Sequence, residues 1–272
     1  MGKGSFNSTI LTKSSNSLDR ANRVLLAFAT ALFIQAIIVL IYINTGSEIF
    51  PSLHRISILL GGSLSAGGYV QFITIFCFVW GLLEIRFQSR KNRFERAYFS
   101  TELLPEEEHR VIGETEINKI RLRISQYLQQ KYSEGQGEDY FLLQIVKKAC
   151  TKFRANQSAE SAFMIVESQS RINRDKSESR QSGIRYLLWA IPSIGFVGTI
   201  LGISQSLAIA NTGDIDLITS TLAVAFDTTL VALVLSLIMM FSYHSLQEAT
   251  ETLHHDIEEY VIEHFINKID VT

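Results

Sequence analysis

The sequence holds few of the residues that metal centres and disulfide frameworks require. It has two cysteines among 272 residues, Cys77 in an apolar stretch and Cys150 in a charged one, and their spacing fits neither arrangement. Four of the six histidines lie between His244 and His264, but their spacing does not place a metal-binding pair on one helix face. The sequence also shows no nucleophile–base pair and no phosphate-binding loop. We therefore expect no metal, no cofactor and no enzymatic activity.

Charged residues are nearly absent from four long windows of the chain. A helix that crosses a bilayer needs about 20 apolar residues, and each window is long enough. The first is too long for the apolar core of a signal peptide, and no small-residue cleavage site follows it, so we interpret it as an uncleaved span. We predict an all-α polytopic membrane protein with four transmembrane helices, at residues 24–43, 65–83, 186–210 and 217–242.

The second window is longer than one crossing requires, because no charge interrupts it from Ile56 to Leu83. Its first part includes the Gly- and Ser-rich stretch 61–68, so we place the start of the span near Ser65 and expect a loop or an interfacial turn before it. The first window contains one strongly polar residue, Gln35. An amide that faces a neighbouring helix is the simplest explanation for it.

Basic residues cluster on one side of the predicted spans. Most of the 25 Lys and Arg residues lie between Arg86 and Arg180, the N-terminal tail is also basic, and the loop 211–216 has two Asp and no base. Lys and Arg enrichment marks the cytoplasmic side, which predicts that both termini are cytoplasmic. Basic charge at the membrane edges, rather than over one face, argues against nucleic acid as a partner.

The segments outside the membrane are predicted from composition and periodicity. Residues 1–20 are rich in Ser, Asn and Thr, which predicts a flexible cytoplasmic tail. Residues 86–183 and 243–272 carry apolar residues at helical spacing between charges. This pattern predicts a cytoplasmic helical segment, with a break at 133–139, and a final amphipathic helix. We interpret the charge runs as solvated faces; the alternative is a docking surface for a soluble partner.

The third span contains a proline and a face of small residues. Gly198 and Gly202 form a G-x-x-x-G pair which, with Gly195, lets another helix backbone approach closely. Thr199 lies within this small face. Pro192 removes one backbone hydrogen bond and bends the helix if it lies in the interior, whereas a position in the first helical turn has no such effect.

The fourth span has a narrow small and polar stripe and one carboxylate. A carboxylate in mid-membrane costs about 2.5–3.5 kcal/mol on insertion scales, so Asp227 is a candidate functional residue. At about 100° per residue, Asp227 and Thr229 lie about 160° apart, so we expect Asp227 to face a neighbouring subunit or a hydroxyl. The stripe suits either close helix packing or a water-accessible lining, and it consists of Thr221, Ala225, Thr228 or Thr229, Ala232 and Ser236.

Thr199 and Thr229 are predicted to lie at the same depth in the membrane. Thr199 follows the cytoplasmic end of its span at Tyr186, and Thr229 precedes the cytoplasmic end at Ser242, by equal numbers of residues. At 1.5 Å per residue both lie about 20 Å inside. Two hydroxyls at one level beside a Gly-rich face form a plausible ring in an oligomer. We therefore assign Thr199 and Thr229 to an ion path, with Thr228 and Asp227 as secondary members.

Two motifs in these spans resemble those of the MotA/TolQ/ExbB family. The segment 192–202, PSIGFVGTILG, is similar to the family pattern P-x-x-G-L-x-G-T-V-x-G, and 225–233, AFDTTLVAL, is similar to A-L-x-A-T-A-x-G-L. Two N-terminal spans, a long cytoplasmic segment and two C-terminal spans follow the layout of the MotA branch. The resemblance matches Thr199 and Thr229 to the family's two threonines and Pro192 to its proline.

The resemblance also implies an assembly and a location. Five such subunits surround two copies of a single-span partner, like MotB, TolR or ExbD, which carries an essential membrane Asp. Protons or sodium ions pass between that Asp and the threonines, and the ring turns around the partner in the bacterial inner membrane. The implied function is an ion-conducting subunit of a rotary membrane motor; the alternative is a non-conducting four-span scaffold or sensor.

The sequence departs from the family pattern in three places. ExbB and TolQ carry a glutamate in the fourth span where this chain has Val224, and Asp227 comes three residues later. Flagellar members have a larger inner segment and a second proline at the inner end of the fourth span, and this chain has neither. We therefore do not assign it as a flagellar stator, and the sequence names neither the ion nor the process that it drives.

Overall fold

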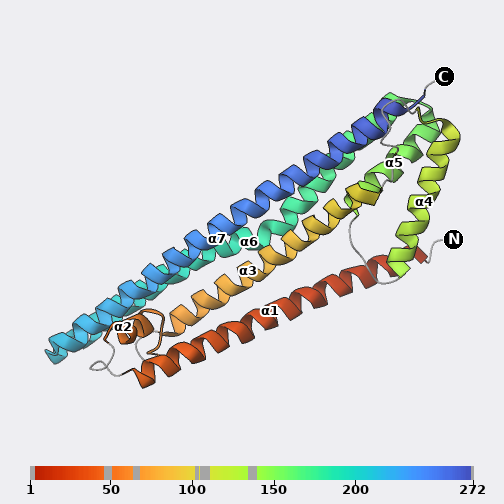
Figure 1. Cartoon of the computed structure of the whole chain (residues 1–272). Coiled ribbons are helices and arrows are strands. Elements are labelled where there is room, and N and C mark those ends of the chain that lie inside the picture. The colour runs from red at the N-terminus through yellow and green to blue at the C-terminus, as the bar shows by residue number, and fades with distance from the viewer. Residues whose placement is uncertain are drawn as a thin grey trace. The chain divides into compact units, whose positions relative to one another are not determined.

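The computed structural model describes residues 4–45, 51–63, 68–101, 104, 111–133 and 140–270. Within these ranges the chain is almost entirely helical, which confirms the all-α prediction (Figure 1). Short 3-10 segments occur at Ala97–Thr101, Ala210–Thr212 and Ile266–Lys268. The α-helices are α1 (Gly4–Asn44), α2 (Pro51–Leu59), α3 (Tyr69–Arg96), α4 (Glu114–Ser133), α5 (Phe141–Asn156), α6 (Ala159–Ile209) and α7 (Ile215–His264).

Four helices are long and apolar enough to cross a membrane, as the sequence predicts. The expected spans 24–43 and 217–242 lie within α1 and α7, and the span 186–210 lies within α6 except for its last residue. The expected span 65–83 begins in residues that are outside the described ranges, and α3 starts at Tyr69. The turn expected before this span contains a short helix, α2.

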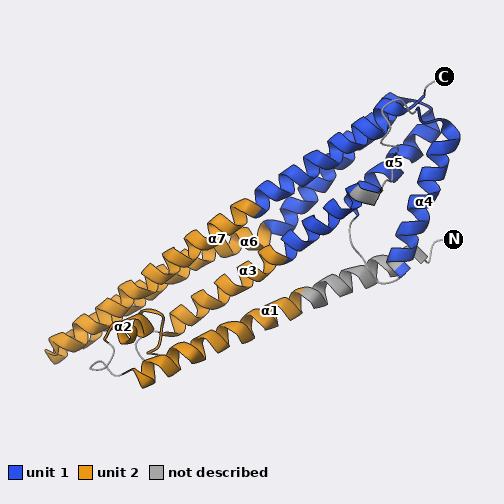
Figure 2. Ribbon diagram, viewed as in Figure 1, with its two compact units in different colours: residues 1–14, 87–181, 246–272 blue, residues 15–86, 182–245 orange. Residues whose placement is uncertain are grey.

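The chain divides into two compact units, which Figure 2 colours separately. Unit 1 comprises Met1–Ser14, Phe87–Gln181 and Leu246–Thr272, and it contains most of the charged residues. Unit 2 comprises Ser15–Arg86 and Ser182–Ser245. The apolar windows of the sequence fall in unit 2, and the charged segment with its expected final helix falls in unit 1.

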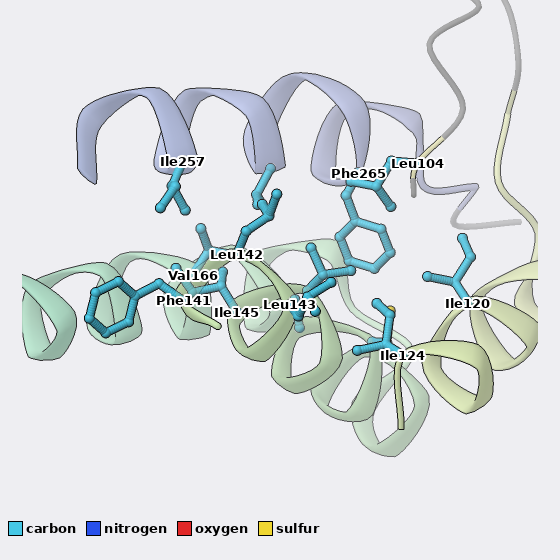
Figure 3. Close-up of a cluster of buried hydrophobic side chains, with 14 of the residues drawn as sticks. Leu104, Ile120, Ile124, Phe141, Leu142, Leu143, Ile145, Val166, Ile257 and Phe265 are labelled. Carbon is cyan, nitrogen blue, oxygen red and sulfur yellow. The ribbon is translucent and has the colours of Figure 1, made fainter. Parts of the chain in front are cut away.

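Unit 1 has a hydrophobic core built from the helical repeats of the sequence. Side chains of α5 lie at its centre, and the apolar faces of α4 and of the last turns of α7 cover them (Figure 3). Full burial of one such side chain contributes about 1.5–3 kcal/mol. The fully or nearly fully buried members include Ile117, Ile124, Leu142, Leu143, Ile145, Leu253, Ile257, Val261 and Phe265. The core explains why so charged a segment folds.

Both ends of the chain differ from a simple reading of the sequence. Residues 4–20, which we expected to form a flexible tail, are part of the 41-residue helix α1. No Pro or Gly follows Gly4 before Gly46, so nothing in the sequence interrupts the helix that the apolar run propagates. Near the C-terminus, Ile269 forms an isolated parallel bridge with Ile112 beyond the end of α7. The break expected at 133–139 begins where α4 ends, and residues 134–139 lie outside the described ranges.

Candidate functional site

The contact between α6 and α7 is made through glycines. Gly195 and Gly202 of α6 lie against Ala232 and Ala225 of α7, close enough that a Cβ atom at either glycine would overlap the alanine. A Cβ atom at Gly198 would lie 2.6 Å from the Thr228 hydroxyl oxygen. The small face predicted for the third span therefore meets the stripe of the fourth. The stripe members at this contact are Ala225, Thr228 and Ala232, and the structure shows that they pack closely against α6.

The structure brings Thr199 and Thr229 into direct contact. Their hydroxyl oxygens form a hydrogen bond with each other across the α6–α7 interface. The Thr199 hydroxyl also lies 3.0 Å from the Ala225 carbonyl oxygen, and the Thr229 hydroxyl lies 3.0 Å from the Gly195 carbonyl oxygen. Both side chains are only partly buried. The oxygens of such a cluster can coordinate a sodium ion, and they can form hydrogen bonds with water molecules that carry protons.

Thr228 is buried beside this pair and shares its carbonyl acceptors. Its hydroxyl lies 2.7 Å from the Ala225 carbonyl oxygen of its own helix and 3.3 Å from the Gly195 carbonyl oxygen of α6. Pro192 lies in the interior of α6, so the alternative of a position in the first helical turn is wrong. Because proline has no N–H, the carbonyl of Leu188 lacks its usual helical donor. The structure thus places the proline one helical turn before the Gly195 contact with α7.

Asp227 forms an ion pair with Arg55 of the same chain. The distance between the Arg55 Nη2 and Asp227 Oδ1 atoms is 2.9 Å, and the carboxylate is almost fully buried. The second carboxylate oxygen, Oδ2, is buried without a hydrogen-bond partner. We expected Asp227 to face a neighbouring subunit or a hydroxyl; within this chain it instead faces an arginine of α2. A buried acid requires such a counter-charge, because an uncompensated charge in the interior costs several kcal/mol.

Sequence reasoning missed Arg55 as a site residue. The signal was available, since Arg55 is the one basic residue in the expected connection 44–55 and Asp227 is the one acid inside the expected fourth span. An ionisable residue inside a membrane segment usually pairs with another. The two residues are 172 positions apart, however, and only the fold of α2 brings them together.

Two buried glutamines hold α2 and the turn that follows it. Gln35 of α1 donates to the Gly61 carbonyl at 2.7 Å, and Gln71 of α3 donates to the Leu59 carbonyl at 3.0 Å. Gly61 has a positive φ of 95°, which a residue with a Cβ rarely adopts. These bonds supply donors to carbonyls at the end of a helix, where the helix itself supplies none. We expected Gln35 to face a neighbouring helix; its amide instead donates to a backbone carbonyl in the turn after α2.

A second polar cluster lies in unit 1, between α6 and α7. Ser177 and His254 share a hydrogen bond of 2.8 Å, and Gln181 donates to the Thr250 hydroxyl at 3.2 Å. Burial, together with the charges of Arg174 and Arg180, lowers the pKa of His254 to about 4. His254 is therefore a neutral residue of a buried network at neutral pH.

These features together define a four-span helical membrane protein whose last two spans pack through glycines around a pair of threonines. A model of the MotA/TolQ/ExbB proton channel family matches residues 133–259. The match includes Pro192, the three glycines, both threonines and Asp227, and it confirms the resemblance that the two motifs carry. No curated protein and no solved structure matches the chain.

Proposed function

We propose that this chain is the ion-conducting subunit of a rotary membrane motor. Protons or sodium ions pass along a path that Thr199 and Thr229 line, with Thr228 and Asp227 beside it, and their flow drives mechanical work. The observation that supports the proposal most directly is the contact between the two threonine hydroxyls at a Gly-rich helix interface. The match to a proton channel family supports the ion-conducting role.

The assembly that we propose follows the family. Five copies of the chain form a ring around two copies of a single-span subunit, like MotB, TolR or ExbD, whose membrane Asp exchanges ions with the threonines. The exposed apolar side chains of α6 and α7 support an oligomer, because each helix offers more apolar surface than its own chain covers; they include Phe196, Ile200, Leu201, Leu230, Leu233 and Leu237. Lipid covers whatever surface the partners leave.

We further propose that the protein lies in the bacterial inner membrane with both termini in the cytoplasm. The positive charges between Arg86 and Arg180 support this orientation. The opposite orientation would require that charged segment to cross the bilayer. In the proposed orientation unit 1 is cytoplasmic, and α2 lies toward the outer side of the membrane.

A non-conducting scaffold or sensor is the second candidate function. The observation that favours it is the use of all three glycines and Thr228 in tight packing, which a purely structural bundle also requires. The core of unit 1 gives it a folded structure, whose charged outer faces would suit the docking of a soluble partner. The two candidates differ in what the half-buried threonine pair does.

Ion flux through Thr→Val variants separates the two functions. Val has nearly the shape of Thr but offers no oxygen. We expect Thr229→Val and Thr199→Val to abolish flux of protons or sodium ions in vesicles made from cells that express the full chain with its native partners. Thr219→Val is the matched control, because Thr219 lies outside the stripe and its hydroxyl bonds the Ile215 and Asp216 carbonyls of its own helix. Unchanged flux in an assembled Thr229→Val protein would contradict the channel proposal.

A further inference from the structure

We propose that Arg55 and Asp227 are positioning residues that fix the rotation of α7 about its own axis, so that Thr229 meets Thr199. The role of the threonines in ion passage rests on the function proposed above, but the positioning itself does not. The ion pair lies on one side of α7, and the threonine contact lies on the other. The pair therefore acts on the threonines through the rigid helix between them.

The angle between the two contacts carries the argument. Asp227 and Thr229 are two residues apart on one helix, which places their side chains about 160° apart around the axis. Arg55 binds the Asp227 carboxylate at 2.9 Å, and Thr199 contacts Thr229 directly. A helix that is held at two nearly opposite points cannot rotate without breaking one of them. Each contact consequently selects the rotation that allows the other.

On the side that faces α6, α7 is held by hydrogen bonds of the Thr228 and Thr229 hydroxyls to the Gly195 carbonyl. Toward α6 it presents Ala225 and Ala232, whose small side chains meet glycines and offer shallow ridges. Small residues permit close approach of two helices, but they interlock less than large ones do. On its exposed side α7 presents apolar residues such as Leu230 and Leu233, which have no directional partner within the chain. The Arg55–Asp227 pair adds a charged, directional contact on the side of α7 away from Thr199.

The helix that carries Arg55 is itself held in place by contacts with two other helices. The helix that bears it, α2, is bonded to α3 through Gln71 and its following turn is bonded to α1 through Gln35, while the rings of Tyr42 and His54 stack at 5.1 Å. The arginine thus links α7 to the other two spans of unit 2. Since Asp227 Oδ2 has no hydrogen-bond partner, Arg55 provides the directional hold on this carboxylate among the described residues.

The rate of disulfide formation between cysteines at positions 199 and 229 measures the rotation of α7, and it requires no measurement of ion flux. In a full-length protein that carries Cys77→Ala and Cys150→Ala, we introduce Thr199→Cys and Thr229→Cys and oxidise native membranes with copper phenanthroline. We expect rapid crosslinking in this protein and a several-fold lower rate when Arg55→Gln or Asp227→Asn is added. The charge exchange Arg55→Asp with Asp227→Arg should restore the rate, because the pair re-forms with opposite polarity.

A second crosslink separates rotation from loss of fold. Ser177 and His254 also join α6 to α7, but in unit 1, and a Ser177→Cys/His254→Cys pair should crosslink equally well with or without Arg55→Gln. Equal crosslinking at 199 and 229 in all variants would overturn the proposal. So would a parallel loss of both crosslinks that the charge exchange does not repair. A threonine variant that still conducts ions would refute the proposed function and leave this result standing.

Discussion

Arg23 of α1 and Glu84 of α3 form an ion pair of 3.0 Å in unit 2, with side-chain exposures of only 16% and 9%. The arginine approaches both carboxylate oxygens, through Nε at 3.0 Å and Nη2 at 3.3 Å. Two-point contact of this kind fixes the relative orientation of the two groups as well as their distance. It joins the first two spans at the end opposite to α2.

Removal of one partner from this pair is expected to destabilise the protein strongly. Arg23→Met leaves the Glu84 charge buried without compensation, and such single changes cost about 3–5 kcal/mol. The double variant Arg23→Met/Glu84→Leu removes both charges and should recover most of that loss. Thermal unfolding of the purified protein in detergent measures both effects. The exposed pair Arg96–Asp256 is the control, since loss of a surface ion pair costs about 0–1 kcal/mol. Equal losses at the two pairs would contradict the burial argument.

Substitution of Gly198 is expected to force α6 and α7 apart. A Cβ atom there would lie 2.6 Å from Thr228 Oγ1 and 2.8 Å from Val70 Cγ1, which is too close for either neighbour to remain in place. We expect Gly198→Ala to lower stability by about 1–3 kcal/mol, the usual cost of an overpacked core. Gly113→Ala is the control, because a Cβ atom at Gly113 meets nothing within 4 Å. A Gly198→Ala protein as stable as the Gly113→Ala protein would show that the helices separate without cost.

Acid is expected to weaken unit 1 through His254. Its folded pKa of about 4 lies below the ordinary value of 6.5, so the unfolded chain binds the proton first as the pH falls. This contribution to stability is complete above pH 6.5 and is lost progressively between pH 6.5 and 4; at pH 5 the loss is about 2 kcal/mol. His254→Gln has no such proton to bind, and its unfolding free energy should fall less between pH 7 and 5. Parallel pH profiles for the two proteins would exclude His254 as the source.

The sequence predicts the elements better than it predicts their contacts. Hydropathy finds the four membrane helices because hydrocarbon excludes charge over a fixed length. Helical periodicity likewise finds the core positions Ile117, Ile124 and Ile257. The 160° angle between Asp227 and Thr229 follows from helix geometry alone, and it correctly separates the two residues. The partner of Asp227 does not follow, because it depends on how α2 folds between two spans.

The expected tail and the turn show why composition alone misleads. Ser and Asn in residues 4–20 indicate flexibility, but a helix that is already nucleated in the apolar run extends with little further cost. The stretch before α3 has the Gly and Ser residues of a loop, and the carbonyls of Gly61 and Leu59 accept hydrogen bonds from Gln35 of α1 and Gln71 of α3. Each glutamine is isolated in its apolar window, so neither pattern reveals its acceptor.

The bond from Gln35 to the Gly61 carbonyl also connects the first span to the turn that precedes the second. Gln35 lies inside the first span, about 14 Å by helix rise before Asn44. A carbonyl left without a donor at membrane depth is costly, so the turn after α2 keeps its hydrogen bonding only where α1 lies beside it. Any change that separates α1 from this turn therefore also removes a hold on the helix that carries Arg55.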